Sequence, residues 1–203
     1  MFHFAERGHH RYISNNAKVM VSTMRAQQGF VETDGLAIPG GAPHYLIVRD
    51  PYARLVSFYR DKFDVYMQQP RQIHQYFDCY KVFFAPLGIR ERDPIRVARA
   101  ALAAMTFPQL VSLLEEDNVT DDVHLMPQAN EAWDFDQVLK MDDPDDLETL
   151  SCLIDLAVHE RDTGSYDVDD YYSPALRRIV QRVYRDDFET FDYSTAARRR
   201  LAA

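Results

Sequence analysis

Residues 45–59 read YLIVRDPYARLVSFY, and the order of apolar and polar side chains in this stretch sets the architecture that we expect for the chain. The apolar run from Tyr45 to Val48 is typical of a short buried strand. Pro51 suits the first position of a helix, where no backbone donor is needed, and Asp50 suits the N-cap before it. Arg49 is therefore predicted at the carboxyl end of a strand, the edge at which open α/β sheets bind ligands.

This strand-to-helix junction predicts an anion site. Arg49 supplies a cation at the end of the strand, and Ser57 lies two helical turns further on, where its hydroxyl is within reach of the same anion. A second interpretation is a plain strand-turn-helix whose arginine pairs with a surface carboxylate. The local pattern leaves both interpretations open.

The longer pattern around this junction resembles a known motif. Arg49-Asp50-Pro51, followed by Arg54-Leu55-Val56-Ser57 and Tyr59, is similar to the 3′-phosphate-binding motif of carbohydrate sulfotransferases. These belong to sulfotransferase family 2, which includes the Golgi chondroitin and dermatan sulfotransferases. The resemblance implies that Arg49 and Ser57 hold the 3′-phosphate of the donor 3′-phosphoadenosine-5′-phosphosulfate (PAPS). It also implies a P-loop-like fold.

A second phosphate site is expected in the loop before the first predicted helix, because such loops present backbone amides to anions. Lys18 is the candidate for the 5′-phosphosulfate and for the charge that develops on the bridging oxygen during transfer. The hydroxyls of Ser22 and Thr23 are candidates for the 5′-phosphate. The whole predicted donor loop is Ala17, Lys18, Val19, Met20, Val21, Ser22 and Thr23.

This loop departs from the pattern of its relatives at two positions. Ala17 stands where relatives commonly have proline, and Met20 stands where a small residue would let the backbone approach a phosphate. Met20 fits if its side chain turns into the core. The departures motivate an alternative function, a catalytically inactive nucleotide-binding or interaction protein that retains the sulfotransferase fold.

The acceptor hydroxyl needs a base, and His124 is the first candidate because histidine suits general base catalysis. It lies in Val123–Gln128, which resembles the His-Trp-x-Pro-Gln segment of the family, with Leu125 in place of tryptophan. Roles in acceptor binding or in loop structure are the alternatives. No metal is expected, and the acidic run Asp142–Asp146 is interpreted as a turn and helix cap because it lacks the spacing of a calcium-binding loop.

Strands alternating with helices predict an α/β fold in three layers, with a mainly parallel central sheet flanked by helices. The predicted strands are residues 11–14, 45–48 and 135–140, and the predicted helices are residues 22–28, 51–67, 95–105, 107–116 and 174–188.

Composition bounds the function. The 203 residues, 46% of them hydrophobic, suit one compact domain over residues 1–203. The net charge of -9 argues against general nucleic-acid binding. Cys79 and Cys152 suggest no disulfide framework and are expected to be reduced core thiols. No signal peptide or long apolar run occurs, which favours a soluble cytoplasmic protein, with association at a membrane surface left open.

Together these features predict a PAPS-dependent sulfotransferase that acts on a hydroxyl of a carbohydrate or glycolipid. Its partners would be the nucleotide donor and that acceptor, without nucleic acid. An acceptor pocket completed by a second copy of the chain, in a homo-oligomer, is a further possibility. A P-loop kinase fits less well because no Gly-Lys-Ser/Thr loop occurs.

Overall fold

The computed structural model describes residues 1–8, 10–34, 38–39, 41–65, 80–90, 92–116, 118–129, 134–157 and 166–196. These residues group into two compact units, which we describe separately. Unit 1 comprises Met1–Asp50 and Gln128–Asp162, and unit 2 comprises Pro51–Pro127 and Thr163–Ala203. A single domain over residues 1–203 remains a prediction.

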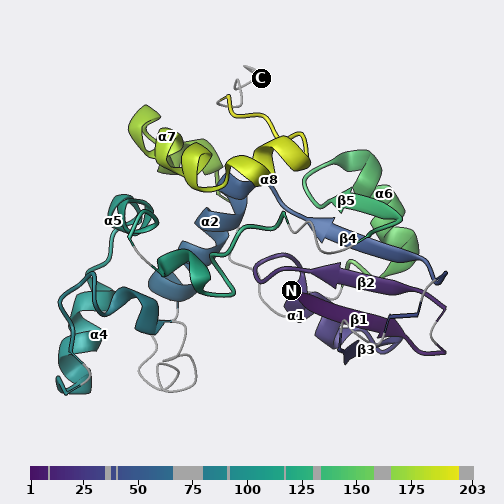
Figure 1. Ribbon diagram of the computed structural model, residues 1–203, viewed down its shortest axis with the longest axis horizontal. Helices are drawn as coiled ribbons and strands as arrows, with labels where there is room; N and C mark the ends of the chain where they lie inside the picture. Colours follow the sequence, from purple (N-terminus) through teal and green to yellow (C-terminus); the bar gives the residue numbers. More distant parts are fainter. Residues whose placement is uncertain are drawn as a thin grey trace. The chain divides into compact units, whose positions relative to one another are not determined.

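Unit 1 is built on a five-stranded sheet with the order β3-β1-β2-β4-β5 (Figure 1). Strands β2, β4 and β5 are parallel to one another, whereas β1 runs antiparallel to both β2 and β3. The α/β prediction is confirmed, and the sheet is mixed rather than purely parallel. The strands are β1 (Phe2–Glu6), β2 (Tyr12–Asn15), β3 (Phe30–Thr33), β4 (His44–Val48) and β5 (Gln137–Lys140).

The sequence did not predict strands β1 and β3. β1 lies inside the sheet between β2 and β3, and its central residues Phe4 and Ala5 are both buried. A strand that is covered on both faces shows no alternation of apolar and polar side chains. Over five residues its pattern therefore does not distinguish a strand from other buried structure. β3 is an edge strand in which the apolar residue Val31 is exposed, so its sequence also lacks the pattern expected of a strand with one buried face.

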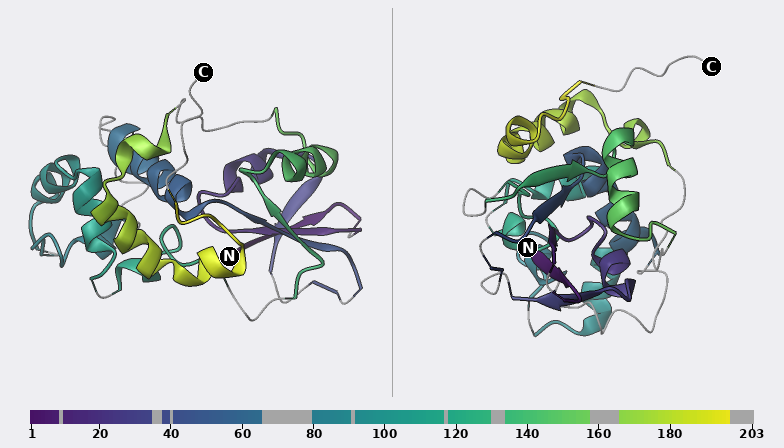
Figure 2. Two further views of the ribbon diagram at one scale, coloured as in Figure 1. Left: turned by 90° about the horizontal axis from the view of Figure 1, so that it is seen from above. Right: turned by 90° about the vertical axis from the view of Figure 1, so that its right-hand side faces the viewer.

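Two helices, α1 (Val21–Ala26) and α6 (Pro144–Leu153), cover one face of this sheet (Figure 2). Their packing buries a core drawn from strands, helices and the loop before α1, namely Phe4, Ile13, Val19, Met24, Ile47, Leu139, Leu150 and Ile154. Helix α6 begins where Asp143 accepts hydrogen bonds from the backbone N–H groups of Asp145 and Asp146. The prediction of a helix cap in the acidic run is therefore confirmed.

The opposite face of the sheet carries a buried polar network of His3, Ser14 and His44. The Ser14 hydroxyl lies 2.7 Å from His3 Nδ1 and 2.6 Å from His44 Nε2. All three residues are buried, and the His44 ring packs against Phe135 with 4.6 Å between centroids. Burial lowers the pKa of both imidazoles below the ordinary value of 6.5, because the charged form loses its hydration.

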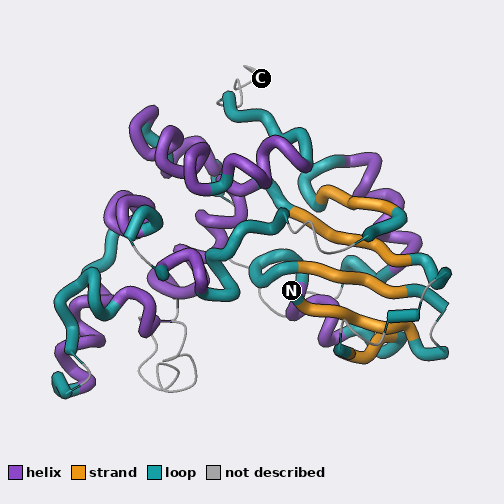
Figure 3. The backbone as a smooth tube through the Cα atoms, in the orientation of Figure 1, coloured by secondary structure: helices purple, strands orange, loops and turns teal. Residues whose placement is uncertain are grey.

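Unit 2 is helical in its described residues (Figure 3). The predicted helix 51–67 is α-helical only to Tyr59 and continues as a π-helix to Val65, and residues 66–67 lie outside the described ranges. The predicted late helix divides at Tyr184 into two. The elements are α2 (Pro51–Tyr59), η2 (Arg60–Val65), η4 (Lys81–Phe83), α4 (Ile95–Ala103), α5 (Phe107–Leu113), η5 (Val119–Asp121), η6 (Val168–Tyr171), α7 (Pro174–Val183) and α8 (Arg185–Thr190).

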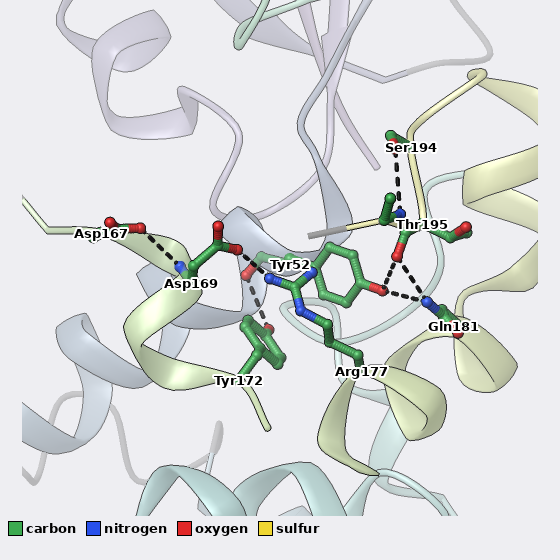
Figure 4. Close-up of polar contacts among 9 residues, drawn as sticks. Tyr52, Asp167, Asp169, Tyr172, Arg177, Gln181, Ser194 and Thr195 are labelled. Atoms are coloured by element: carbon green, nitrogen blue, oxygen red, sulfur yellow. Dashed lines mark hydrogen bonds and ion pairs between the residues drawn. The ribbon is translucent and has the colours of Figure 1, made fainter. Parts of the chain in front are cut away.

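The first turn of α2 is held through Tyr52 (Figure 4). The guanidinium of Arg177, from α7, lies 4.5 Å from the centre of the Tyr52 ring, a favourable cation–π geometry. The Tyr172 hydroxyl donates to the Tyr52 carbonyl at 3.0 Å, and the Tyr52 hydroxyl donates to the Thr195 carbonyl at 3.3 Å. Contacts of Tyr172, Arg177 and Thr195 with Tyr52 therefore stabilise the position of the helix that contains Ser57.

The next turn of α2 is held by Arg54, whose side chain is almost fully buried. Its Nη2 donates to the carbonyls of Met126 at 2.6 Å and His124 at 3.2 Å, and its Nη1 lies 3.8 Å from the carboxylate of Asp187. This buried network uses the guanidinium to fix the segment before Gln128. Arg54 is thus a structural residue of unit 2.

Two minor expectations can be compared with the described residues. Cys152 is exposed, so the prediction that it is a core thiol is wrong, and Cys79 lies outside the described ranges. Among the helices that the structure describes, none combines the length and the apolar character needed to cross a membrane.

The buried imidazoles generate a prediction for the pH dependence of stability. Because their pKa is lower in the folded state, the unfolded chain binds protons below pH about 6.5 that the folded chain does not bind. Stability is fully present above this pH and falls as the pH decreases through it. The charge of the amino terminus lowers the pKa of His3 further, whereas Asp34 raises it, and Asp136 raises the pKa of His44.

We expect His44→Gln to flatten this pH dependence, measured as the free energy of unfolding in urea between pH 7.5 and 5.5. The matched control is His10→Gln at an exposed position, which should retain the slope of the parent protein. Equal slopes for the parent and His44→Gln would contradict the prediction.

Candidate functional site

The candidate site lies at the carboxyl ends of β2 and β4. These neighbouring strands are parallel, and Asn15 of β2 pairs with Ile47 of β4. Parallel strands end at the same edge of a sheet, so the segments that follow them meet there. The segment after β2 is the Lys18 loop, which we define as residues 16–20, and the segment after β4 begins with Arg49.

The Lys18 loop is a tight turn with an unusual backbone. The Val19 N–H donates to the Asn16 carbonyl at 3.1 Å, and both Lys18 (φ 65°) and Met20 (φ 56°) adopt the left-handed conformation. Each such non-glycine residue costs about 1–3 kcal/mol, and this strain is commonly found at ligand sites. The Met20 side chain packs against the core of unit 1, which confirms the condition under which methionine fits this position.

The structure places the other residues of the predicted donor loop at the start of α1 and just before it. Ala17 and Val19 are buried, and Val21 is the first residue of α1. Ser22 and Thr23 lie in the first turn of this helix, Ser22 half-buried and Thr23 buried. Ser22 and Thr23 therefore follow the Lys18 loop directly in the chain.

Arg49 reaches the Lys18 loop from the end of β4. Its Nη1 lies 3.5 Å from the Lys18 carbonyl oxygen, and its Nε lies 4.0 Å from Asp142 Oδ1. The other Asp142 oxygen accepts the Asp50 N–H at a much shorter 2.7 Å. Asp142 therefore pairs with Arg49 and also accepts a backbone hydrogen bond, so the interpretation of Arg49 as the partner of a carboxylate stays open beside the anion site.

Gln128 fixes the backbone of Arg49, a role that the sequence did not reveal. Its Oε1 accepts the Arg49 N–H at 3.0 Å and its Nε2 donates to the Arg49 carbonyl at 2.7 Å. The side chain is fully buried, so both hydrogen bonds are shielded from water. The only signal in the sequence was the position of Gln128 in the family-like segment.

The remaining predicted residues, Ser57 and His124, belong to unit 2. Ser57 is buried on α2, and its neighbour Phe58 packs against the His124 ring with 5.8 Å between centroids. His124 Nδ1 lies 2.8 Å from Asp122 Oδ1 and donates its proton to this carboxylate. In the neutral imidazole Nε2 is then the acceptor, which is the form that a general base requires. The orienting Asp122 was not predicted.

Two asparagine side chains beside the loop contain polar atoms that no described group satisfies. They are both amide atoms of Asn15, which is fully buried, and Nδ2 of Asn16, which is 2% exposed. Burial of an amide without a hydrogen bond costs about 1–3 kcal/mol. Such atoms therefore call for an explanation in water, an ion or a ligand.

The described part of the chain contains no group of three or more His, Cys, Asp or Glu side chains arranged to hold a metal ion. The predicted cations of the candidate site are those of Lys18 and Arg49. Cations with hydroxyls and backbone amides suit an anion such as a phosphate or sulfonate group.

A comparison with protein families gives one match over most of the chain. The family model described as "Sulfotransferase family" matches residues 22–194. The matched region includes Arg49, Ser57 and His124 and begins after Lys18. Comparisons with curated proteins and with solved structures found no match.

The clamp on Arg49 gives a testable prediction. Gln128→Leu leaves the Arg49 N–H and carbonyl without their buried partners, so the free energy of unfolding should fall by about 3 kcal/mol. Chemical denaturation measures this quantity. Gln28→Leu at an exposed position is the control and should change it by less than about 0.5 kcal/mol. Equal stability of the two variants would contradict the clamp.

Proposed function

Since the chain belongs to the sulfotransferase family, we propose that it transfers a sulfuryl group from PAPS to a hydroxyl of a carbohydrate or glycolipid. The observation that carries this proposal is the meeting of Arg49 with the Lys18 loop at the carboxyl edge of β2 and β4. Two cations from two strand ends match a nucleotide that bears phosphate groups on two sides of its ribose. The preference for carbohydrate acceptors rests on the likeness of the Arg49 motif to that of carbohydrate sulfotransferases.

In this proposal the donor is held at both ends. Lys18, with the hydroxyls of Ser22 and Thr23, binds the 5′-phosphosulfate. Arg49 binds the 3′-phosphate through its planar guanidinium, which can give two parallel hydrogen bonds to phosphate oxygens. Ser57 contributes a hydroxyl to the same phosphate from α2. Recognition of the 3′-phosphate separates this donor from ATP.

Transfer requires a proton acceptor and a group that balances charge on the leaving nucleotide. His124 Nε2 takes the proton of the attacking hydroxyl, while Asp122 holds Nδ1–H and stabilises the imidazolium that results. The Lys18 ammonium offsets the charge that grows on the bridging oxygen as its bond to sulfur breaks. No metal is needed for this division of roles.

The proposal includes a setting and partners. We place the protein in the cytoplasm. Its partners would be PAPS and a carbohydrate or glycolipid acceptor. Contact with a membrane surface and formation of a homo-oligomer are additional parts of the proposal. The acidic net charge of -9 supports a role without nucleic acid.

The second candidate function is a nucleotide-binding or interaction protein that has lost transfer activity. Two observations favour it: left-handed residues at Lys18 and Met20 where the loop has no glycine, and a family match that begins only at Ser22. Such a protein would bind the nucleotide without turnover or would bind a protein partner.

Calorimetric titration with 3′-phosphoadenosine-5′-phosphate tests the donor site without knowledge of the acceptor. We expect binding that exceeds the binding of AMP and of ATP with magnesium. Arg49→Ala should weaken it about 100-fold, because charged hydrogen bonds of about 1.5–3 kcal/mol are lost.

The control for this titration is Arg25→Ala, which removes an exposed arginine of unit 1 paired with Glu32 and should leave nucleotide affinity unchanged. Absence of binding to every nucleotide would overturn the sulfotransferase proposal and would leave an interaction protein with the retained fold as the candidate function. Binding that is insensitive to Arg49→Ala would remove Arg49 from the site.

Turnover separates the two candidate functions. With sulfur-labelled PAPS and a panel of carbohydrates and glycolipids, we expect transfer by the parent protein and a loss of about 10²–10⁴-fold in rate for His124→Ala. Nucleotide affinity should stay unchanged in this variant. Tight nucleotide binding without transfer to any acceptor would favour the inactive form, and an unchanged rate in His124→Ala would exclude this base.

A further inference from the structure

Asn15 is the last residue of β2 and directly precedes the Lys18 loop. Its side-chain Nδ2 and Oδ1 are both buried, and neither has a hydrogen-bond partner among the described residues. Asn16, the next residue, also has an unsatisfied Nδ2. Unsatisfied amides of two consecutive residues thus coincide with the start of the candidate donor loop.

Strand geometry places the Asn15 side chain on the face that α1 covers. Successive side chains of a strand point to opposite faces, and Ile13 belongs to the core beneath α1 and α6. Asn15 lies two residues further along β2 and pairs with Ile47 of the same core. At this end of the strand the chain crosses from β2 to α1, so the amide lies on the side of the sheet toward which the Lys18 loop turns.

Other buried amides in unit 1 show what a structural role looks like. Gln27 donates to the Asp155 carbonyl at 2.8 Å and accepts the Asp155 N–H at 3.1 Å. Gln128 makes the same pair of hydrogen bonds to the backbone of Arg49. Asn15 has the same functional group and is as deeply buried as Gln128, yet it supports no described backbone group.

We propose that the Asn15 side chain is a binding group for a tetrahedral oxyanion, with Nδ2 donating a hydrogen bond to an anionic oxygen. The identity of this anion, the phosphate or sulfonate group at the 5′ end of the nucleotide donor, rests on the proposed function. A neutral amide suits the position because it adds a donor without adding the charge of a third cation or the repulsion of a carboxylate.

The burial of the amide supports this role. The group is already out of water before a ligand arrives, so no hydration needs to be removed from it on binding. A hydrogen bond formed there is also stronger than one formed at the surface, because the surroundings have a low dielectric constant. Oδ1 remains available to accept from an ammonium group or from a water molecule that accompanies the anion.

Paired measurements on Asn15→Leu distinguish this role from a structural one. Leucine has the same branched shape, with as many side-chain heavy atoms and no polar ones, so we expect the melting temperature to rise by about 3 °C as the unsatisfied atoms are removed. Affinity for 3′-phosphoadenosine-5′-phosphate should fall about 10-fold. Gln27→Leu is the matched control, and it should show a lower melting temperature with unchanged affinity.

The side-chain amide of Asn15 can also be observed directly by nuclear magnetic resonance. Its pair of signals is assigned by its disappearance in Asn15→Leu, and the parent protein is titrated with inorganic sulfate, inorganic phosphate and 3′-phosphoadenosine-5′-phosphate. Saturable shifts of these signals support the proposal, and the ligand that gives them identifies the preferred anion.

The outcomes separate failure of this inference from failure of the proposed function. If the nucleotide binds the parent and Asn15→Leu equally and the amide signals do not move, the inference is overturned and the donor site stands. If sulfate or phosphate shifts the signals but the nucleotide does not bind, the oxyanion site is supported and the proposed function fails. If no probe shifts the signals, the amide binds none of these anions and the inference is overturned.

Discussion

The structure of unit 1 depends on the parallel pairing of β2 with β4. A parallel pair cannot be closed by a tight turn, so the chain must cross over between the two strands, and residues 16–43 include α1 and the edge strand β3. The same pairing puts the carboxyl ends of both strands at one edge. Because β5 is parallel to β4 as well, Asp142 also reaches this edge. One constraint on strand direction therefore brings Arg49, the backbone of the Lys18 loop and Asp142 to one edge of the sheet.

Polar side chains in unit 1 divide into those that support the backbone and those that do not. Gln128 and Asp142 satisfy backbone groups at Arg49 and Asp50, so the end of β4 is held firmly. The Lys18 loop, by contrast, contains two residues in a strained conformation and adjoins the unsatisfied amide of Asn15. At a binding site we expect a rigid strand end beside a loop with unfavourable local energy. Residues that contact a ligand are commonly not those that would give the most stable fold.

Unit 2 holds the helix that continues directly from the donor motif. Helix α2 begins at Pro51, immediately after Asp50, and contains Ser57 in its second half. Tyr52 and Arg54 fix the helix to other parts of unit 2 through buried hydrogen bonds and the contact with Arg177. The two arginines of the motif thus differ in role: Arg54 holds the interior of unit 2, and Arg49 reaches the Lys18 loop of unit 1.

The sequence by itself determined the features that depend on near neighbours. The strand before Arg49, the helix start at Pro51, the cap of α6 and the motif of the family all follow from side-chain patterns within a few residues. Only the tertiary structure decided the place of β1 inside the sheet and the clamp on Arg49 by Gln128, which is 79 residues away. It also revealed the unsatisfied amide of Asn15. Distant strands pair, and polar atoms become buried, when segments remote in the sequence pack together. The local periodicity of the sequence does not indicate which segments these are.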